Sequence, residues 1–200
     1  MVIKRLDTET RQAQIKKAAL NIISSEGLAN LSTRNLASKT GISEGALFRH
    51  FSSKKEIMLS ILADVKSELL ATMEEITYSA HRNAEQKLQD FLCAHIHYLV
   101  ENKGITILLF SEAAHMNDAN LKKGLREILL AQKEYVIRIV KQGIQEGVWD
   151  RTLDVKHVAT LYMGIPISLN IETILQSDML KTENFCAKMG SLLKKVLETK

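Results

Sequence analysis

The chain has 200 residues, of which 46% are hydrophobic and 25% are charged, values that are ordinary for a globular protein. One proline and nine glycines favour long helices over a turn-rich sheet. The net charge is +4 and is unevenly placed, because residues 1–60 hold ten Lys and Arg against five Asp and Glu. The remaining 140 residues hold seventeen against eighteen. A local basic excess of this kind is typical of a segment that contacts phosphates.

Targeting segments and cofactor motifs are not predicted. We find no apolar run that approaches the length of a membrane span, and the opening MVIKRLDTETRQ lacks a signal-peptide pattern. The two cysteines, Cys93 and Cys186, have no metal-binding or redox spacing. We therefore expect a cytoplasmic protein with reduced thiols, no membrane contact and no cofactor.

The first predicted helix runs from Asp7 or Thr8 to about Ser25, and Gly27 ends it. Two shorter helices follow within Ser32–Phe51. Ser32 and Ser43 are suitable N-caps, and Gly41 can adopt the left-handed conformation that ends the first of the two. Two capped helices joined by a glycine turn predict a helix-turn-helix, whose second helix enters the DNA major groove.

The rest of the chain continues as helices. Ser53-Lys54-Lys55-Glu56 forms a capping box that opens a long helix to about Ile76. Further helical periodicity is predicted over residues 84–101, 105–115, 119–146, 155–176 and 182–197. We therefore expect an all-α protein with three parts: a DNA-binding domain at residues 1–52, a linking helix at 53–76, and a C-terminal helical bundle at 77–200.

The segment Ser32-x-x-x-Leu36-Ala37-x-x-x-Gly41-Ile42-Ser43-x-Gly45-x-Leu47-Phe48-x-His50-Phe51, followed by Ser53-Lys54-x-Glu56, resembles the DNA-binding domain of the TetR family of repressors. The resemblance covers residues 8–65, and the remainder fits that family in length and helical character. One position departs from the family pattern. The family usually has tyrosine where this chain has Phe48, so the hydroxyl that contacts a phosphate is missing.

The predicted DNA contacts divide into two groups. Glu44, Gly45, Ala46 and Arg49 lie in the reading helix where base edges are expected. Arg49 has two interpretations, a bidentate contact to guanine or a phosphate contact. Glu44 also has two, accepting from cytosine or complementing the positive helix N-terminus. The resemblance assigns contacts with the DNA backbone to a second set: Thr33, Arg34, Ser43, Phe48, His50 and Lys54.

The resemblance implies that the C-terminal bundle encloses an apolar effector pocket, that effector binding moves the fourth helix, and that the last two long helices pair across a two-fold axis. Pro166 lies inside the run 155–176, where it should kink the helix and free backbone carbonyls. Polar and apolar side chains surround it, as a small-molecule pocket requires. The candidate ligand-binding residues, each also compatible with ordinary core packing, are Phe91, His95, Phe110, Tyr135, Tyr162, Met163, Pro166 and Asn170.

Enzymatic and metal sites are not predicted. Residues that match a nucleophile motif or a phosphate loop are missing. His95 and His97 point apart on a helix, whereas Glu112 and His115 share a face but supply only two ligands. We therefore expect a homodimeric repressor that binds a palindromic DNA operator and is released by a small, apolar effector. The alternative is an all-helical carrier of hydrophobic small molecules whose basic N-terminal part no longer functions.

Overall fold

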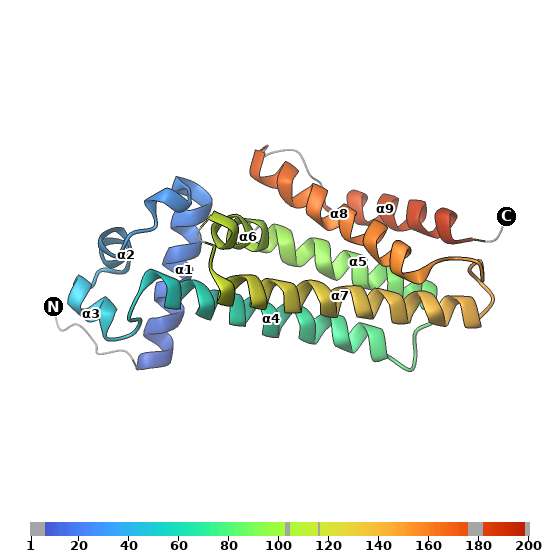
Figure 1. The fold of residues 1–200 in the computed structure, drawn as a ribbon, viewed down its shortest axis with the longest axis horizontal. Helices are drawn as coiled ribbons and strands as arrows, with labels where there is room; N and C mark the ends of the chain where they lie inside the picture. Colours follow the sequence, from blue (N-terminus) through green and yellow to red (C-terminus); the bar gives the residue numbers. More distant parts are fainter. Residues whose placement is uncertain (1–6, 103–104, 116, 176–181, 199–200) are drawn as a thin grey trace.

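The computed structural model describes residues 7–102, 105–115, 117–175 and 182–198, and the described residues are almost entirely helical (Figure 1). The all-α prediction is confirmed. In chain order the elements are α1 (Thr8–Glu26), the 3-10 turn η1 (Leu28–Asn30), α2 (Thr33–Thr40), α3 (Glu44–Phe48), α4 (Lys54–Tyr78), α5 (Ala84–Glu101), α6 (Ile105–His115), α7 (Ala119–Gln145), α8 (Val155–Leu175) and α9 (Thr182–Leu197).

The helices α1, α2 and α3 form a small head whose helix ends are fixed by caps. The Ser32 hydroxyl accepts from the Asn35 amide at 3.1 Å, and the Ser43 hydroxyl accepts from the Ala46 amide at 3.1 Å. Gly41 is left-handed, with φ of 66°, so a residue with a Cβ would be strained there. Buried Ile22, Leu36 and other apolar side chains pack the head from inside.

The reading helix α3 is shorter than predicted. We expected helical spacing to reach Phe51, but α3 ends at Phe48. The next amides, those of Arg49 and His50, bond carbonyls three residues back, at 3.2 and 2.9 Å. This tightening of the last turn ends the α-helix while it leaves Phe51 buried in the head.

The long helix α4 leaves the head and enters the body (Figure 1). The Ser53 hydroxyl accepts from the Glu56 amide at 3.2 Å, and the Glu56 carboxylate accepts from the Ser52 amide. Farther along, α4 packs closely on α7, because a Cβ on Gly124 would lie 2.6 Å from Leu62. One rigid element therefore touches both the head and the bundle.

The body consists of the second half of α4 with α5, α6, α7, α8 and α9; α5 lies between α4 and the pair α8 and α9, and α7 packs on α4, α5 and α8 (Figure 1). At the end far from the head, the chain's single tryptophan, Trp149, is 2% exposed and lies against Gly143 of α7. A Cβ at Gly143 would come within 2.0 Å of the indole ring, so this close approach requires glycine. The amide of the neighbouring Asp150 donates to the Leu197 carbonyl at 2.9 Å. The turn after α7 is thereby attached to the end of α9.

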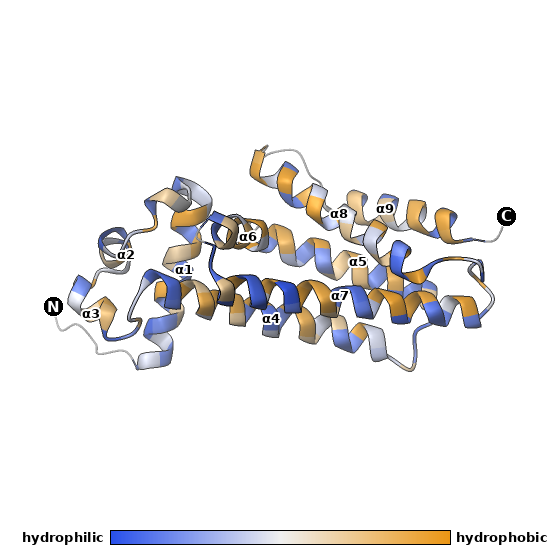
Figure 2. Ribbon diagram, viewed as in Figure 1, coloured by the Kyte–Doolittle hydropathy of each residue, from blue (hydrophilic) through white to orange (hydrophobic). Residues whose placement is uncertain are grey.

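Two features of the body differ from expectation. Cys93 of α5 and Cys186 of α9 form a disulfide, whereas we expected two reduced thiols. The helix α8 is long and apolar enough, by length and composition, to cross a membrane, whereas we expected no apolar run near that length. Core helices of water-soluble proteins pass the same test. In this structure α8 packs against α5 and α7 and buries Tyr162 and Leu169, and Figure 2 shows its hydrophobic character.

Candidate functional site

The first candidate site is the exposed surface made by the N-termini of α2 and α3. Ser43, Glu44, Gly45 and Arg49 are exposed, and open space surrounds the position that a Cβ on Gly45 would take. The Thr33 hydroxyl donates to the Glu44 carboxylate at 2.9 Å, which links the starts of the two helices. This bond gives Glu44 a protein partner in addition to the two interpretations made from sequence.

Phe48 is the exposed aromatic residue of this surface, with 48% of its side chain accessible. About half of Phe48 is therefore available to a partner outside the chain. It can contact sugar and methyl groups of DNA, but it cannot donate a hydrogen bond to a phosphate.

The remaining residues predicted to contact DNA differ in their exposure. Arg34 is exposed, whereas Thr33, Ala46 and His50 are half-buried. The His50 carbonyl accepts from the Gln12 amide at 3.0 Å, so α1 fixes the backbone at the end of the reading helix. The His50 Nδ1 atom is buried and has no hydrogen-bond partner among the described residues.

Lys54, predicted to face the DNA backbone, is held by an acid from the body. Its ammonium lies 3.0 Å from the carboxylate of Glu112 on α6. Glu112 is a buried residue, with 7% of its surface exposed. The adjacent Lys55 lies 2.6 Å from Asp118, the N-cap of α7. The Lys55 ammonium, together with the Leu121 and Asn120 amides, holds the pKa of Asp118 below its ordinary value. Two ion pairs therefore connect the first turn of α4 with α6 and α7.

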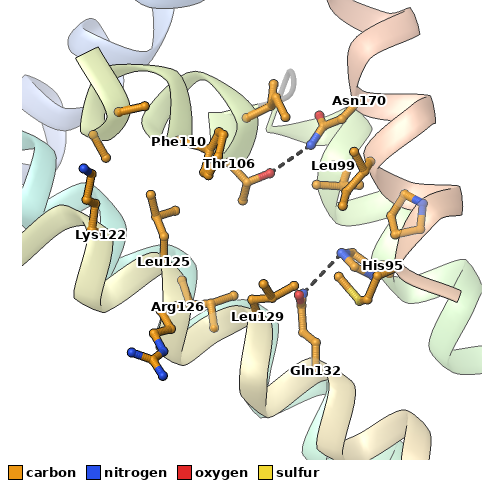
Figure 3. Close-up of a pocket in the computed structure, with 17 residues that line it drawn as sticks. His95, Leu99, Thr106, Phe110, Lys122, Leu125, Arg126, Leu129, Gln132 and Asn170 are labelled. Carbon is orange, nitrogen blue, oxygen red and sulfur yellow. Dashed lines mark hydrogen bonds between the residues drawn. The ribbon is translucent and has the colours of Figure 1, made fainter. Parts of the chain in front are cut away.

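The second candidate site is a cavity of about 560 Å³ between α5, α6, α7 and α8. Its walls are predominantly apolar, and its opening exposes Phe110, with 60% of the side chain accessible, and Leu129. Figure 3 shows the side chains converging on this space. The lining residues are His95, Leu99, Thr106, Ile107, Phe110, Ala113, Ala114, Lys122, Leu125, Arg126, Ile128, Leu129, Gln132, Met163, Pro166, Ile167 and Asn170.

A buried polar chain closes the α5 side of the cavity. His95 Nε2 lies 3.2 Å from the Gln132 amide nitrogen, and His95 Nδ1 lies 3.3 Å from the Tyr162 hydroxyl. Burial lowers the pKa of His95 to about 3, so the imidazole is neutral at pH 7. A Gln132 amide that donates to Nε2 requires the imidazole proton to be on Nδ1, where it can be donated to the Tyr162 hydroxyl.

Two further polar features distinguish the ends of the cavity. At the α8 side, the Asn170 amide donates to the Thr106 hydroxyl at 2.9 Å (Figure 3), while the Asn170 carbonyl is buried without a partner among the described residues. At the opening, Lys122 and Arg126 of α7 are exposed. The cavity therefore combines an apolar interior, one buried acceptor and a cationic rim.

The predicted ligand-binding residues fall into two groups. His95, Phe110, Met163, Pro166 and Asn170 line the cavity. Phe91, Tyr135 and Tyr162 do not; they stack edge to face behind it, with ring centroids 5.6 and 6.3 Å apart. The helix α8 continues through Pro166, and this proline cannot donate to the Tyr162 carbonyl one turn earlier.

Sequence reasoning missed most of the α6 and α7 walls, including Thr106, Lys122 and Arg126. Leu125, Leu129 and Gln132 belong to the apolar stripe of the 119–146 helix, which was a usable signal. Among the described residues, His, Cys, Asp and Glu side chains form no group of three that could hold a metal ion. Glu112 instead pairs with Lys54, and His97 is exposed.

Two family models match this chain, and both describe regulatory proteins. Residues 15–61 match the family described as bacterial regulatory proteins, tetR family, and residues 81–169 match the tetracyclin repressor-like C-terminal domain. The chain belongs to the TetR family of transcriptional regulators. This family is one of regulatory proteins rather than enzymes.

Individual relatives are distant in sequence. The fatty acid metabolism regulator protein of Bacillus subtilis (strain 168) is 24% identical over 151 residues, covering 76% of this chain and 77% of that protein. The ketosteroid transcriptional regulator KstR2 of Mycobacterium tuberculosis has a similar structure, with a TM-score of 0.79, 18% identity and full coverage of both chains. FadR from B. subtilis in complex with stearoyl-CoA has a TM-score of 0.75 and 21% identity, covering 93% of this chain and 99% of that one.

Proposed function

We propose that this protein is a cytoplasmic, ligand-responsive transcriptional repressor that binds a palindromic operator as a homodimer and is released by a small-molecule effector. The observation that carries the proposal is the pair of ion pairs between Lys54 and Glu112 and between Lys55 and Asp118. They connect the helix that leaves the DNA-reading head with α6 and α7, two of the four helices that line the cavity. In this proposal residues 1–52 read DNA, 53–76 link, and 77–200 bind effector and dimerise.

The ion pairs give the effector a direct way to influence DNA contact. Lys54 is the predicted phosphate ligand, and its ion pair with Glu112 fixes its position relative to α6. A ligand between α6 and α7 displaces the helices that carry Glu112 and Asp118. The spacing of the two heads then changes through α4, and the effector shifts the population toward the DNA-free form.

The dimer is proposed on two grounds. A single helix-turn-helix reads few base pairs, whereas two heads about 34 Å apart can contact successive major grooves. The outer faces of α8 and α9 also expose apolar side chains that the monomer leaves unburied. We propose that a second copy of this chain covers them. They are Leu161, Ile171, Ile174, Leu175, Leu192 and Val196.

The lining of the cavity supports a particular class of effector. Its apolar interior favours an extended hydrocarbon or ring system, and Lys122 with Arg126 at the opening favours an anionic headgroup. The similarity to a regulator crystallised with stearoyl-CoA makes a fatty acyl thioester the first compound class to test. We therefore propose an amphiphile with one apolar part and one anionic part.

The test of DNA binding is selection from a random DNA library at moderate and high salt, followed by sequencing of the retained fragments. We expect a palindrome whose recovery falls steeply with salt, because phosphate contacts release counterions. A carrier of hydrophobic molecules would bind its ligands almost independently of salt and would retain no sequence. That result, obtained with folded protein, would favour the alternative function.

The effector is tested with the recovered operator. Stearoyl-CoA, stearate, stearyl alcohol and free coenzyme A separate the contributions of tail and headgroup to operator release. We expect stearoyl-CoA to be the strongest, and the Lys122→Gln/Arg126→Gln variant to need at least tenfold more of it. The same variant should respond to the uncharged alcohol as the unmodified protein does. If the variant also needed at least tenfold more stearyl alcohol to release the operator, the substitutions would have damaged the cavity rather than the headgroup contact.

A further inference from the structure

Cys93 and Cys186 join helices that are far apart in the chain. Cys93 lies in the middle of α5, Cys186 lies near the start of α9, and the disulfide closes a loop with a sequence separation of 93 residues. Their Cα atoms are 5.3 Å apart, within the range of about 4.4–6.8 Å that disulfides span. Packing of α9 on α5 therefore already places the two side chains within bonding reach.

The disulfide is the covalent anchor of the first half of α9, where the partly buried Phe185 and Met189 also pack against the core. The buried residues of this helix follow one narrow stripe that faces α5: Cys186, Gly190, Leu193 and Leu197. Leu193 and Leu197 hold the second half, together with the bond from the Asp150 amide to the Leu197 carbonyl. In the first half, Cys186 is the buried side chain among the residues whose burial is described.

The immediate surroundings suit thiol chemistry. The Gln89 side-chain amide lies 3.2 Å from the Cys93 sulfur and 3.3 Å from the Cys186 carbonyl. A donor at that position favours the thiolate, the form that reacts with disulfides. Cys93 is half-buried while Cys186 is 7% exposed, so an incoming small molecule reaches Cys93 first.

We propose that the Cys93–Cys186 pair is a reversible redox-modification site that fixes the first half of α9 to α5 when oxidised and releases it when reduced. The inference rests on the proposed function, because a repressor of chromosomal DNA works where thiols are kept reduced. Disulfides in that compartment are transient, redox-sensing bonds rather than permanent ones.

The chemistry balances with a low-molecular-weight disulfide as oxidant. The Cys93 thiolate attacks one sulfur of oxidised glutathione, forms a mixed disulfide and expels one glutathione thiolate. The Cys186 thiolate then attacks the Cys93 sulfur, forms the Cys93–Cys186 bond and releases the second glutathione. The protein loses two electrons and two protons, which the two glutathione molecules gain. Reduced glutathione reverses both steps.

Fixing α9 affects the surface that a second copy is proposed to cover. Leu192 and Val196, 53% and 56% exposed, lie on the face of α9 that does not contact α5. Because α9 is one continuous helix, a tether at Cys186 also limits the tilt of the second half that carries these side chains. Dimerisation then costs less conformational freedom in the oxidised protein. We therefore expect the oxidised protein to dimerise more tightly.

The experiment compares the full-length protein equilibrated with reduced and with oxidised glutathione. Thiol alkylation and mass measurement report the disulfide, and amide hydrogen exchange reports the mobility of α9. On reduction we expect the bond to open, exchange over Thr182–Leu197 to accelerate at least tenfold, and exchange over α2 and α3 to stay constant. The melting temperature should fall by about 10 °C, because a long closed loop is released.

The control is the Cys93→Ser/Cys186→Ser variant, which should match the reduced protein in both buffers. By sedimentation, the oxidised protein should have a dimer dissociation constant about tenfold lower than the reduced protein or the variant. Failure of the disulfide to form, or its formation with unchanged α9 exchange and dimerisation, would overturn the proposal. A protein that responds to glutathione as expected but binds no DNA in either state would instead overturn the proposed function.

Discussion

The head and the body use their side chains in opposite ways. In the head, Arg49 and Phe48, two of the residues proposed to contact DNA, have exposed side chains outside a small core. In the body, the polar lining residues His95 and Asn170 are buried and hydrogen-bonded to Gln132 and Thr106, respectively. Truncation of these exposed side chains in the head should therefore change binding without changing stability, whereas substitution of buried lining residues in the body should change both.

The largest effect is expected from pH, through His95. Its pKa is about 3 in the folded protein, compared with an ordinary 6.5. Below pH 6.5 the imidazole of the unfolded chain therefore binds a proton, whereas the buried imidazole of the folded chain stays neutral until about pH 3. Proton binding favours the unfolded chain, so the free energy of unfolding falls as the pH decreases. Between pH 7 and pH 5 this group should remove about 2 kcal/mol from the free energy of unfolding.

Urea unfolding at the two pH values measures this loss, with His95→Gln as the matched variant. Glutamine keeps polar atoms beside Tyr162 and Gln132 but does not titrate, so its stability should change by about 2 kcal/mol less over the same interval. Equal pH dependence in the two proteins would show that His95 is not held neutral by burial.

In the head, Arg49→Ala should weaken operator binding by about 10- to 100-fold, the usual range for loss of a base or charged phosphate contact. The melting temperature should stay constant because the side chain is exposed. Titration against the selected operator and against an operator with one base pair changed measures the loss. If Arg49 reads guanine, discrimination between the two operators disappears; if it holds a phosphate, both affinities fall equally. Lys156→Ala, an exposed change far from the head, is the control.

Gly45→Ala should move stability and binding in opposite directions. Open space surrounds the added Cβ in the free protein, and alanine favours a helix over glycine by up to about 1 kcal/mol. The same methyl group would lie where the DNA is proposed to approach, and we expect operator affinity to fall about tenfold. Thermal unfolding and operator titration on the same sample test both parts. Unchanged affinity would place Gly45 away from the DNA.

The smallest effect on operator affinity is expected from a substitution in the ion pair that connects the head to the body. Glu112→Gln removes the charge that holds Lys54, so operator affinity should rise about threefold and the effector should release less DNA. Glu127→Gln is a matched control, because it removes the acid of an exposed ion pair between α4 and α7, with Lys66. If effector release from Glu112→Gln equals that of the control, the ion pair does not transmit the signal.

The two regions also differed in how far sequence alone could describe them. The N-caps Ser32, Ser43 and Ser53 accept hydrogen bonds from amides three residues away. Their roles can therefore be predicted from a short segment of sequence. The end of α3 was misplaced because Phe51 stays buried after the helix has ended.

The cavity depends on helices that meet only after folding. Pro166 and Asn170 were found because proline inside an apolar helix is unusual. Thr106 and Arg126 were missed because nothing near them in the sequence shows which side of α6 or α7 faces α8. For the same reason spacing could not reveal the Cys93–Cys186 pair, which the packing of α9 on α5 creates.

Trp149 provides an intrinsic fluorescence probe of the body. It is the chain's single tryptophan, it is enclosed against Gly143, and it adjoins the turn that bonds the end of α9. Its fluorescence therefore comes from one known place, and the head contributes no indole emission. Changes in emission wavelength will follow the opening of the far end of the body, and loss of DNA binding without such a change will identify events that leave this end in place.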